Sequence, residues 1–424
     1  MVALQRAAFG GILVVYLALA AAYARLTPAW NNPDEPAHYI YVAHIAETGT
    51  LPVLAHGDWD PDRLEPLIKS HFPPGSAIDF LRYESWQPPL YYLLAAPVYG
   101  LAPDNPPFAR LQALHVFNIL LGAATLGLTY LVARDVFDCP WLGLATAGVL
   151  LGVPMFAATS AAINNDNLAN VIGAALTLLL VRLVGSPRAG YGSALGVGVV
   201  IGLGVLTKLT VGYFLPLALL TVGVRARRSG DGLSRAARES LVLLAGLMLV
   251  MSPWLVRQGL TYGWDDLLAK HRHDEVLIGR AFPSFEPSYL EAWGDRLFRS
   301  AWALFGWMQI PTSEKLYQLW SAVCQVALVG VAVELVARPR GRTLLLLGVA
   351  GGALATIFYY NVTTDVQPQG RFLFVALAAM VSLVALGWSA LLPPRARLPA
   401  VCALDATLLA FNIYTLIAYL RPAF

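Results

Sequence analysis

Apolar stretches close to the length of a membrane-spanning helix recur along the whole chain. A helix needs about 20 mostly apolar residues to cross the hydrocarbon core of a bilayer, and hydropathy indicates about eleven such stretches, within a range of about ten to thirteen. They begin near Phe9, Arg110, Trp141, Asp166, Tyr191, Lys208, Leu241, Leu316, Leu344, Phe372 and Val401. Only 13% of the 424 residues are charged, too few to cover a soluble surface of that size. The sequence therefore predicts an all-α polytopic membrane protein.

We expect residues 1–424 to form one integral membrane domain, with no separate soluble domain. The first apolar stretch, from Phe9 to about Leu26, lacks a clear small-residue cleavage site and is interpreted as a retained anchor. No basic patch is interleaved with aromatic residues, so no nucleic acid partner is expected. The three cysteines have neither metal-site nor disulfide spacing and are interpreted as packing residues.

Arginine in the short connections indicates an orientation in the membrane. The arginines fall in alternate connections, so one face receives nearly all of them, and the positive-inside rule places that face and the N-terminus in the cytoplasm. Two long connections, residues 27–109 and 257–313, are then extracytoplasmic. Each contains an aromatic-rich amphipathic stretch, 86–99 and 289–308, that we expect to form an interfacial helix. Six of the seven histidines fall in these connections, so chemistry is expected at the extracytoplasmic surface.

Two adjacent carboxylates, Asp34 and Glu35, follow the first predicted span where it would reach water. A carboxylate held beside a bilayer can act as a general base towards a lipid-borne substrate. An ordinary explanation stays open, because Pro36 could begin a helix and acids are common near helix N-termini. His38 would share a helix face with Asp34. The pair could chelate a divalent metal, His38 could donate to phosphate, or His38 could be a hydrogen-bonded structural residue.

Six short motifs lie at the predicted outer ends of the spans. They are Pro-Asp-Glu-Pro-Ala-His-Tyr at 33–39, Gln-Pro-Pro-Leu-Tyr-Tyr at 87–92, Asn-Asn-Asp-Asn at 164–167, Leu-Thr-Lys at 206–208, Phe-Gly-Trp at 305–307 and Gln-Gly-Arg-Phe at 369–372. As a set they resemble the GT-C membrane glycosyltransferases, in particular a bacterial group related to protein O-mannosyltransferases and lipid A aminoarabinose transferase. Gln87 stands where the aminoarabinose transferases have a basic residue. The Trp-Trp-Asp-Tyr-Gly signature of oligosaccharyltransferases is absent, which disfavours en bloc transfer to asparagine.

The resemblance implies the GT-C fold and a sugar donor carried on a polyprenyl phosphate in a bacterial plasma membrane. The acceptor would be a hydroxyl on a protein, a glycolipid or a polysaccharide. Such a reaction needs a base and a cationic partner for the departing phosphate, but no nucleotide-binding fold. The family motif carries its acid at the position of Asp34, which is therefore the predicted base. Glu35 would lie on another side of the helix and orient the base or bind the sugar.

Other candidates lie at the outer ends of later spans. Asp166 is a second candidate acid, with a helix cap as the alternative. Arg371 and Lys208 are the candidates for the phosphate, because the short connections that hold them otherwise avoid positive charge; snorkelling to the lipid headgroups is the alternative. Arg257 is a third cationic candidate, and Gln87, with His38, completes the predicted donor-binding set.

Two other functions share the membrane topology. A lipid-linked glycan flippase or transporter would place ionisable residues near the bilayer midplane, often in paired halves, whereas these charges gather at one surface. An O-antigen-type polymerase also has large outer loops, but the paired acid after the first span argues against it. The sequence therefore predicts glycosyl transfer, with a divalent metal left open and no other cofactor required.

Overall fold

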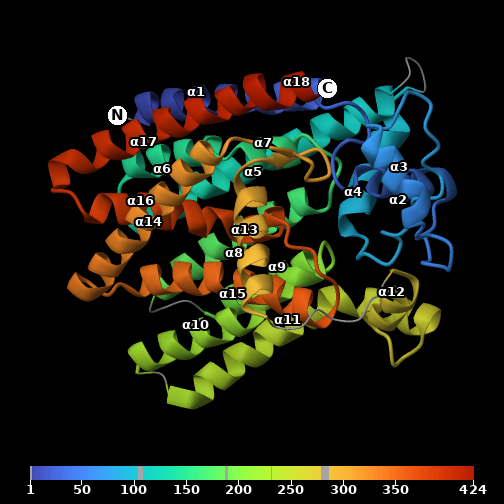
Figure 1. Ribbon diagram of the computed structural model, residues 1–424. Coiled ribbons are helices and arrows are strands. Elements are labelled where there is room, and N and C mark those ends of the chain that lie inside the picture. The colour runs from blue at the N-terminus through green and yellow to red at the C-terminus, as the bar shows by residue number, and fades with distance from the viewer. Residues whose placement is uncertain (1, 104–107, 187–189, 231, 278–285) are drawn as a thin grey trace.

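The computed structural model is a bundle of long helices, and it describes residues 2–103, 108–186, 190–230, 232–277 and 286–424 (Figure 1). The α-helices are α1 (Val2–Leu26), α2 (Glu35–Thr48), α3 (Pro61–Lys69), α4 (Leu90–Leu101), α5 (Ala109–Phe137), α6 (Pro140–Leu151), α7 (Pro154–Ser160), α8 (Asp166–Gly185), α9 (Tyr191–Val205), α10 (Phe214–Arg228), α11 (Gly232–Tyr262), α12 (Lys270–Leu277), α13 (Pro287–Trp302), α14 (Glu314–Ala337), α15 (Gly341–Thr363), α16 (Leu377–Ala390), α17 (Pro394–Thr415) and α18 (Arg421–Ala423). Three short helical segments, η1 (Leu209–Tyr213), η2 (Gly370–Ala376) and η3 (Leu416–Leu420), and two antiparallel strands, β1 (Leu304–Phe305) and β2 (Ile310–Pro311), complete the described elements.

All eleven predicted apolar stretches coincide with helices. Within the described ranges, nine helical segments are long and apolar enough to cross a membrane. The bent pair α6–α7 makes a tenth, and α9 is a shorter apolar helix of 15 residues. The chain is therefore a multi-pass membrane protein. Apolar side chains fill two cores, one centred on α5, α8, α11 and α15, the other on α1, α6, α16 and α17.

The break between α6 and α7 bends the chain by 76°. Pro154 has no N–H to donate, and its ring prevents the helix from continuing through the preceding turn. Gly152 lies against α17, where an added Cβ would come within 2.2 Å of the Leu408 Cβ. The bend carries α7 towards Arg371, beside which Met155 lines a small hollow.

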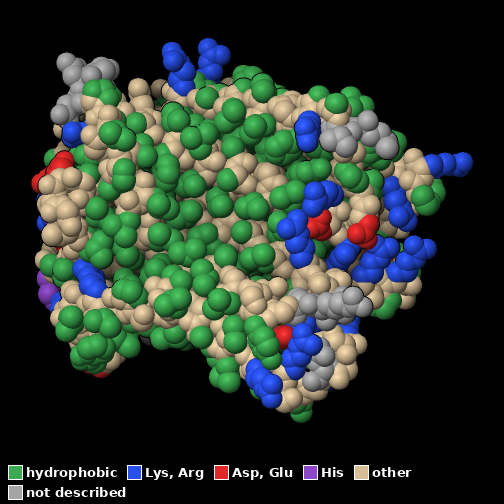
Figure 2. Space-filling model, turned by 180° about the vertical axis from the view of Figure 1, so that it is seen from behind, with side chains coloured by type: hydrophobic (Ala, Val, Ile, Leu, Met, Phe, Trp, Pro, Cys, Tyr) green, Lys and Arg blue, Asp and Glu red, His purple; other side chains and the backbone are tan. Residues whose placement is uncertain are grey.

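The two ends of the bundle differ in connection length and in charge. Short connections gather at one end, where Arg134, Arg182 and Arg342 pair with Asp135 or Asp138. The connections that carry α2, α3, α4 and α12 lie at the other end (Figure 1). Seen from behind, Lys and Arg side chains gather at the short-connection edge and hydrophobic side chains cover the middle (Figure 2). The arginine-bearing connections thus share one end of the molecule, as the sequence predicts.

Candidate functional site

Asp34 ends the turn that leads into α2. Its φ of 66° lies in the left-handed region, which Asp tolerates better than most residues. The side chain makes no capping bond to α2. Instead Oδ1 accepts a hydrogen bond from the Tyr83 hydroxyl at 2.7 Å, and Oδ2 pairs with Arg371 Nη2. Burial alone would raise the pKa of Asp34, but Arg371 and Tyr83 outweigh burial and hold the pKa below its ordinary value. The carboxylate is therefore ionised, and a helix-capping role does not explain it.

Arg371 is the second residue of η2 and is only 4% exposed. Gly370 makes this placement possible, since an added Cβ there would lie 2.1 Å from the Ala301 nitrogen on α13. The guanidinium donates from Nε to Gln369 Oε1 at 2.8 Å and from Nη1 to the Pro33 carbonyl at 3.3 Å. A snorkelling arginine would expose its charged head, whereas this one is enclosed by protein groups.

Lys208, just before η1, meets Asp166 at the start of α8. Lys208 Nζ pairs with Asp166 Oδ1, and Arg371 Nη1 lies 3.8 Å from Asp166 Oδ2. The Lys208 and Asp166 side chains are 14% and 5% exposed, so Lys208 does not snorkel. The helix-cap alternative for Asp166 fails as well, because the N-cap of α8 is Asn165 and the Asp166 carboxylate lies against Lys208 and Arg371. The Asp166 carboxylate thus lies beside both Lys208 and Arg371.

Asp34, Lys208 and Arg371 line one cavity of about 300 Å³, at the lower end of the range for small-molecule sites. The other lining residues divide by chemistry, and we call the polar residues the polar wall and the apolar residues the apolar wall. The polar wall adds Tyr83, Glu84, Gln87 and Asn165, and the apolar wall includes Leu209, Leu277, Ile357 and Phe372. Tyr359 also lines the cavity and is 68% exposed, so the cavity reaches the surface of the bundle. Asp166 does not line it and lies behind the two cations.

Comparison with known proteins gives this architecture a name. The family model for dolichyl-phosphate-mannose-protein mannosyltransferases matches residues 87–256. No protein of curated function matches the sequence. Among solved structures, ArnT from Cupriavidus metallidurans bound to undecaprenyl phosphate superposes with a TM-score of 0.57 at 14% identity, over 97% of this chain and 74% of that one. The chain has the GT-C fold.

Archaeal proteins superpose over part of their length. The Archaeoglobus fulgidus oligosaccharyltransferase in complex with Zn and sulfate gives a TM-score of 0.51 at 15% identity, over 97% of this chain and 52% of that chain. AglB from the same organism, in complex with an inhibitory peptide and a dolichol-phosphate, gives 0.52 at 13% identity, over 96% and 55%. The chain thus spans about half the length of these archaeal GT-C proteins.

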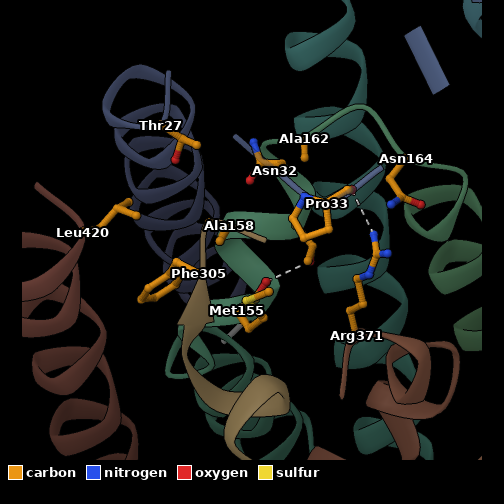
Figure 3. A pocket seen from close by; sticks show the side chains of 12 residues that line it. Thr27, Asn32, Pro33, Met155, Ala158, Ala162, Asn164, Phe305, Arg371 and Leu420 are labelled. Atoms are coloured by element: carbon orange, nitrogen blue, oxygen red, sulfur yellow. Dashed lines mark hydrogen bonds between the residues drawn. The ribbon is translucent and has the colours of Figure 1, made fainter. Parts of the chain in front are cut away.

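Four of the six motifs that resemble GT-C enzymes meet beside Arg371. Pro33 and Asn164, from two of these motifs, line a hollow of about 10 Å³ together with Arg371 and with Phe305 from a third. Figure 3 shows the Arg371 side chain pointing towards Pro33, with Phe305 on the far side of the hollow. The hollow is too small for a substrate, and within it the Pro33 carbonyl accepts a hydrogen bond from the guanidinium.

His38 lines the cavity one helical turn after Asp34, but its hydrogen-bond partner is Tyr92. His38 Nδ1 lies 2.8 Å from the Tyr92 hydroxyl, and the two rings stack. Burial lowers the pKa of His38 to about 3 despite the Asp34 carboxylate, so the ring is neutral. The described residues contain no group of three or more His, Cys, Asp or Glu side chains that could hold a metal ion. The residues around Asp34 and His38 therefore do not fit a metal site, and no chemical step is assigned to a metal.

Glu35 is fully buried and points away from the cavity. Its Oε1 lies 2.8 Å from His115 Nε2 and accepts the Ile163 N–H at 3.3 Å, while Oε2 accepts the Trp30 N–H at 3.1 Å. Glu35 thus lies on a different side of α2 from Asp34, as expected, but it has no access to a sugar. Its contacts tie the start of α2 to α5 and to the connection before α8.

Of the two other predicted donor-binding residues, Gln87 lines the cavity and Arg257 does not. Arg257 does not line the cavity, because Nη2 donates to the Pro52 carbonyl at 2.7 Å and Nη1 donates to Gln258 Oε1 at 2.6 Å. A phosphate role for Arg257 is therefore not supported, and the residue instead anchors the first long connection to α11. Gln87 lines the cavity, where its Oε1 accepts a long hydrogen bond of 3.4 Å from Asn165 Nδ2.

Tyr83 and Glu84 are among the cavity residues that were not predicted from the sequence. Tyr83 donates to Asp34, and Glu84 is 9% exposed with no hydrogen-bond partner for Oε2. Burial and the Asp34 charge raise the pKa of Glu84 to about 8. A single acid in a long loop is normally solvated. The sequence signal that could have identified Glu84 was therefore its position, three residues before the motif that starts at Gln87.

Proposed function

We propose that the protein is a membrane glycosyltransferase that moves one sugar from a polyprenyl-phosphate donor to an acceptor hydroxyl. The observation that carries the proposal is the cavity in which an ionised carboxylate, Asp34, lies beside two cations, Lys208 and Arg371. A base for the acceptor and positive charge for the departing phosphate are the groups that this reaction requires. The GT-C fold supports the same conclusion, and the ArnT structure that shares it holds undecaprenyl phosphate.

The proposed reaction is a single displacement. The acceptor oxygen attacks the anomeric carbon while the bond from that carbon to the phosphate oxygen breaks. The hydroxyl proton passes to Asp34, and polyprenyl phosphate leaves with the electron pair, so the configuration at the anomeric carbon inverts. Arg371 and Lys208 stabilise the negative charge that grows on the leaving phosphate, the arginine through two N–H groups and the lysine as a point charge.

The apolar wall of the cavity suits the lipid part of the donor. Leu209 and Phe372 adjoin the two cations, and Ile357 and Tyr359 continue along α15 to the surface of the bundle. A prenyl chain could follow this wall while its phosphate stays beside Arg371. The polar wall with Glu84 would then receive the sugar.

We place the reaction on the extracytoplasmic face of a bacterial plasma membrane. The cavity lies at the end of the bundle opposite the arginine-bearing connections that gather around Asp135. By the positive-inside rule those connections are cytoplasmic. The acceptor, whether protein, glycolipid or polysaccharide, would then approach from outside.

The test uses purified protein with undecaprenyl phosphates that carry labelled glucose or mannose. Incubation with hydroxyl acceptors, and with water as the simplest acceptor, should release undecaprenyl phosphate and move the label to the acceptor. The Asp34→Asn variant should lack this activity. A flippase or transporter would move the labelled lipid across liposomes without breaking its sugar–phosphate bond. Movement without transfer to any acceptor would overturn the proposal.

A further inference from the structure

We propose that Glu84 is a neutral carboxylic acid that binds a hydroxyl group of the donor sugar and so contributes to the selection of that sugar. The inference rests on the proposed function, because it needs a sugar in the cavity. Glu84 is 9% exposed, lines the cavity, and has one oxygen, Oε2, that is buried without a hydrogen-bond partner. A buried polar atom without a partner is costly, and the side chain that carries this oxygen lines the cavity.

The position of Glu84 fits the sugar better than the phosphate. The side chain lies close enough to Asp34, Lys208 and Arg371 for their charges to affect it. A sugar attached to a phosphate between the two cations would therefore extend towards Glu84. Trp59 and Trp86 line the same cavity and add flat apolar surfaces beside the carboxyl group, the combination typical of a small-ligand site.

The neutral form is the one that suits this position. A protonated carboxyl offers one O–H donor and a carbonyl acceptor, which match a sugar hydroxyl that both accepts and donates. An ionised Glu84 would instead place a second negative charge near Asp34 and near the donor phosphate. Burial and the Asp34 charge raise the pKa of Glu84 to about 8, while Lys208, a hydrogen bond from Gln87 and Arg371 oppose them.

The other titratable groups facing Glu84 do not obscure its titration. They are Asp34 at the start of α2, Lys208 before η1, Arg371 on η2, and the hydroxyls of Tyr41, Tyr83, Tyr92 and Tyr360. His38, Lys270, His273 and Asp365 line the same cavity. Burial lowers the pKa of His38 to about 3 and also lowers the pKa of His273, so neither ring titrates near pH 8. Tyrosine ordinarily loses its proton at about pH 10, and arginine stays protonated throughout this range. Asp34 is ionised at every pH above neutrality, so an alkaline change near pH 8 belongs to Glu84.

The experiment compares two lipids near neutral pH, bare undecaprenyl phosphate and undecaprenyl phosphate carrying glucose or mannose. Glu84→Ala should weaken binding of the sugar-bearing lipid on the order of 10-fold, the worth of one good hydrogen bond, and leave bare undecaprenyl phosphate unchanged. Glu84→Gln, which keeps a neutral donor and acceptor, should bind both lipids within about 3-fold of wild type. Asp79→Ala, an exposed acid of the same connection, is the matched control.

The pH dependence gives a second readout that does not depend on Glu84→Ala being stable. Wild-type transfer should fall as the pH rises through about 8 and Glu84 ionises, whereas Glu84→Gln should keep its activity. Equal weakening of both lipids by Glu84→Ala, no weakening of either, or an unchanged alkaline fall in Glu84→Gln would each overturn the inference. Wild-type protein that binds neither lipid would overturn the proposed function itself, so the two failures are distinguishable.

Discussion

Arg371 and Asp34 are 337 positions apart in the chain and form an ion pair in the wall of the cavity. The pair joins the proposed phosphate ligand directly to the proposed base. While Arg371 holds the carboxylate, the pKa of Asp34 stays below its ordinary value and the carboxylate is a weak base. A donor phosphate would compete for the same guanidinium. As Arg371 turns to the phosphate, Asp34 loses its main cation and gains basicity, so donor binding would itself prepare the base.

Asp34→Asn should therefore separate binding from catalysis. Loss of the general base should reduce kcat by about 10²–10⁴-fold. Donor binding should be unchanged or tighter, because the amide no longer competes with phosphate for Arg371. Isothermal titration with undecaprenyl phosphate measures binding, and labelled sugar transfer measures kcat.

The control for this variant is Asp79→Asn, which neutralises an exposed acid in the same connection and should behave as wild type. The Asp34→Asn chain should be somewhat less stable, because buried Arg371 keeps only Asp166, at 3.8 Å, as an acidic partner. Transfer within a few fold of wild type would remove Asp34 as the base.

Arg371→Lys should keep the charge and lose most of the activity. Lysine cannot present two parallel N–H groups to a phosphate, and removing one preorganised contact of this kind commonly costs about 10²–10³-fold in turnover. Binding of undecaprenyl phosphate should fall less than turnover, since charge on the leaving oxygen grows towards the transition state. Arg82→Lys, at an exposed arginine of the first connection, supplies the comparison; full activity in Arg371→Lys would contradict the assignment.

Between about pH 5 and pH 7, kcat/KM should be flat. The pKa of Asp34 is lowered in the folded protein, so the carboxylate stays ionised until the pH falls below the ordinary range for Asp. His38 would usually titrate within this window, but burial lowers its pKa to about 3 and keeps the ring neutral. An inflection in the window that disappears in His38→Gln would show that the ring does take up a proton.

Arg257→Gln should affect stability more than chemistry. Arg257 donates to the Pro52 carbonyl from the outer end of α11 and does not line the cavity. We expect kcat within a few fold of wild type and a loss of about 1–3 kcal/mol in stability, because the buried carbonyl loses its donor. Faster proteolysis of the first long connection would report the loosened contact. A fall in kcat like that of Arg371→Lys would restore Arg257 as a phosphate ligand.

The spans could be predicted because a bilayer requires helices of a certain length and hydropathy. Membrane-spanning helices must be long and apolar, so polar residues at their ends, such as Lys208 and Arg371, are expected near the membrane surface. The sequence carries less information about lateral position. The sequence predicts both Arg257 and Arg371 at the ends of spans, yet the Arg257 side chain turns to Pro52, and hydropathy does not predict that direction.

The different roles of two adjacent acids could not be predicted from the sequence either. Asp34 and Glu35 are neighbours in sequence, but the first faces the cavity and the second is buried against His115. Glu84 was missed because its burial depends on segments distant in sequence, including η1 and η2. The bend between α6 and α7 was not predicted, although Pro154 follows Gly152 by two residues and both residues disfavour a continuous helix.

Variants of Lys208 and Asp166 should separate an effect on stability from an effect on activity. Lys208→Met leaves Asp166 buried with Arg371 as its remaining cation, and breaking a buried pair costs about 3–5 kcal/mol. Adding Asp166→Asn removes the uncompensated charge, so the double variant should recover most of the lost melting temperature. Sugar transfer should stay about 10²-fold low, because Lys208 lines the cavity and the phosphate still lacks that charge. Asp166→Asn alone should reduce transfer far less than Asp34→Asn, since Asp166 lies behind the cations. If activity returns together with stability in the double variant, Lys208 serves the fold alone and Arg371 is left to bind the phosphate.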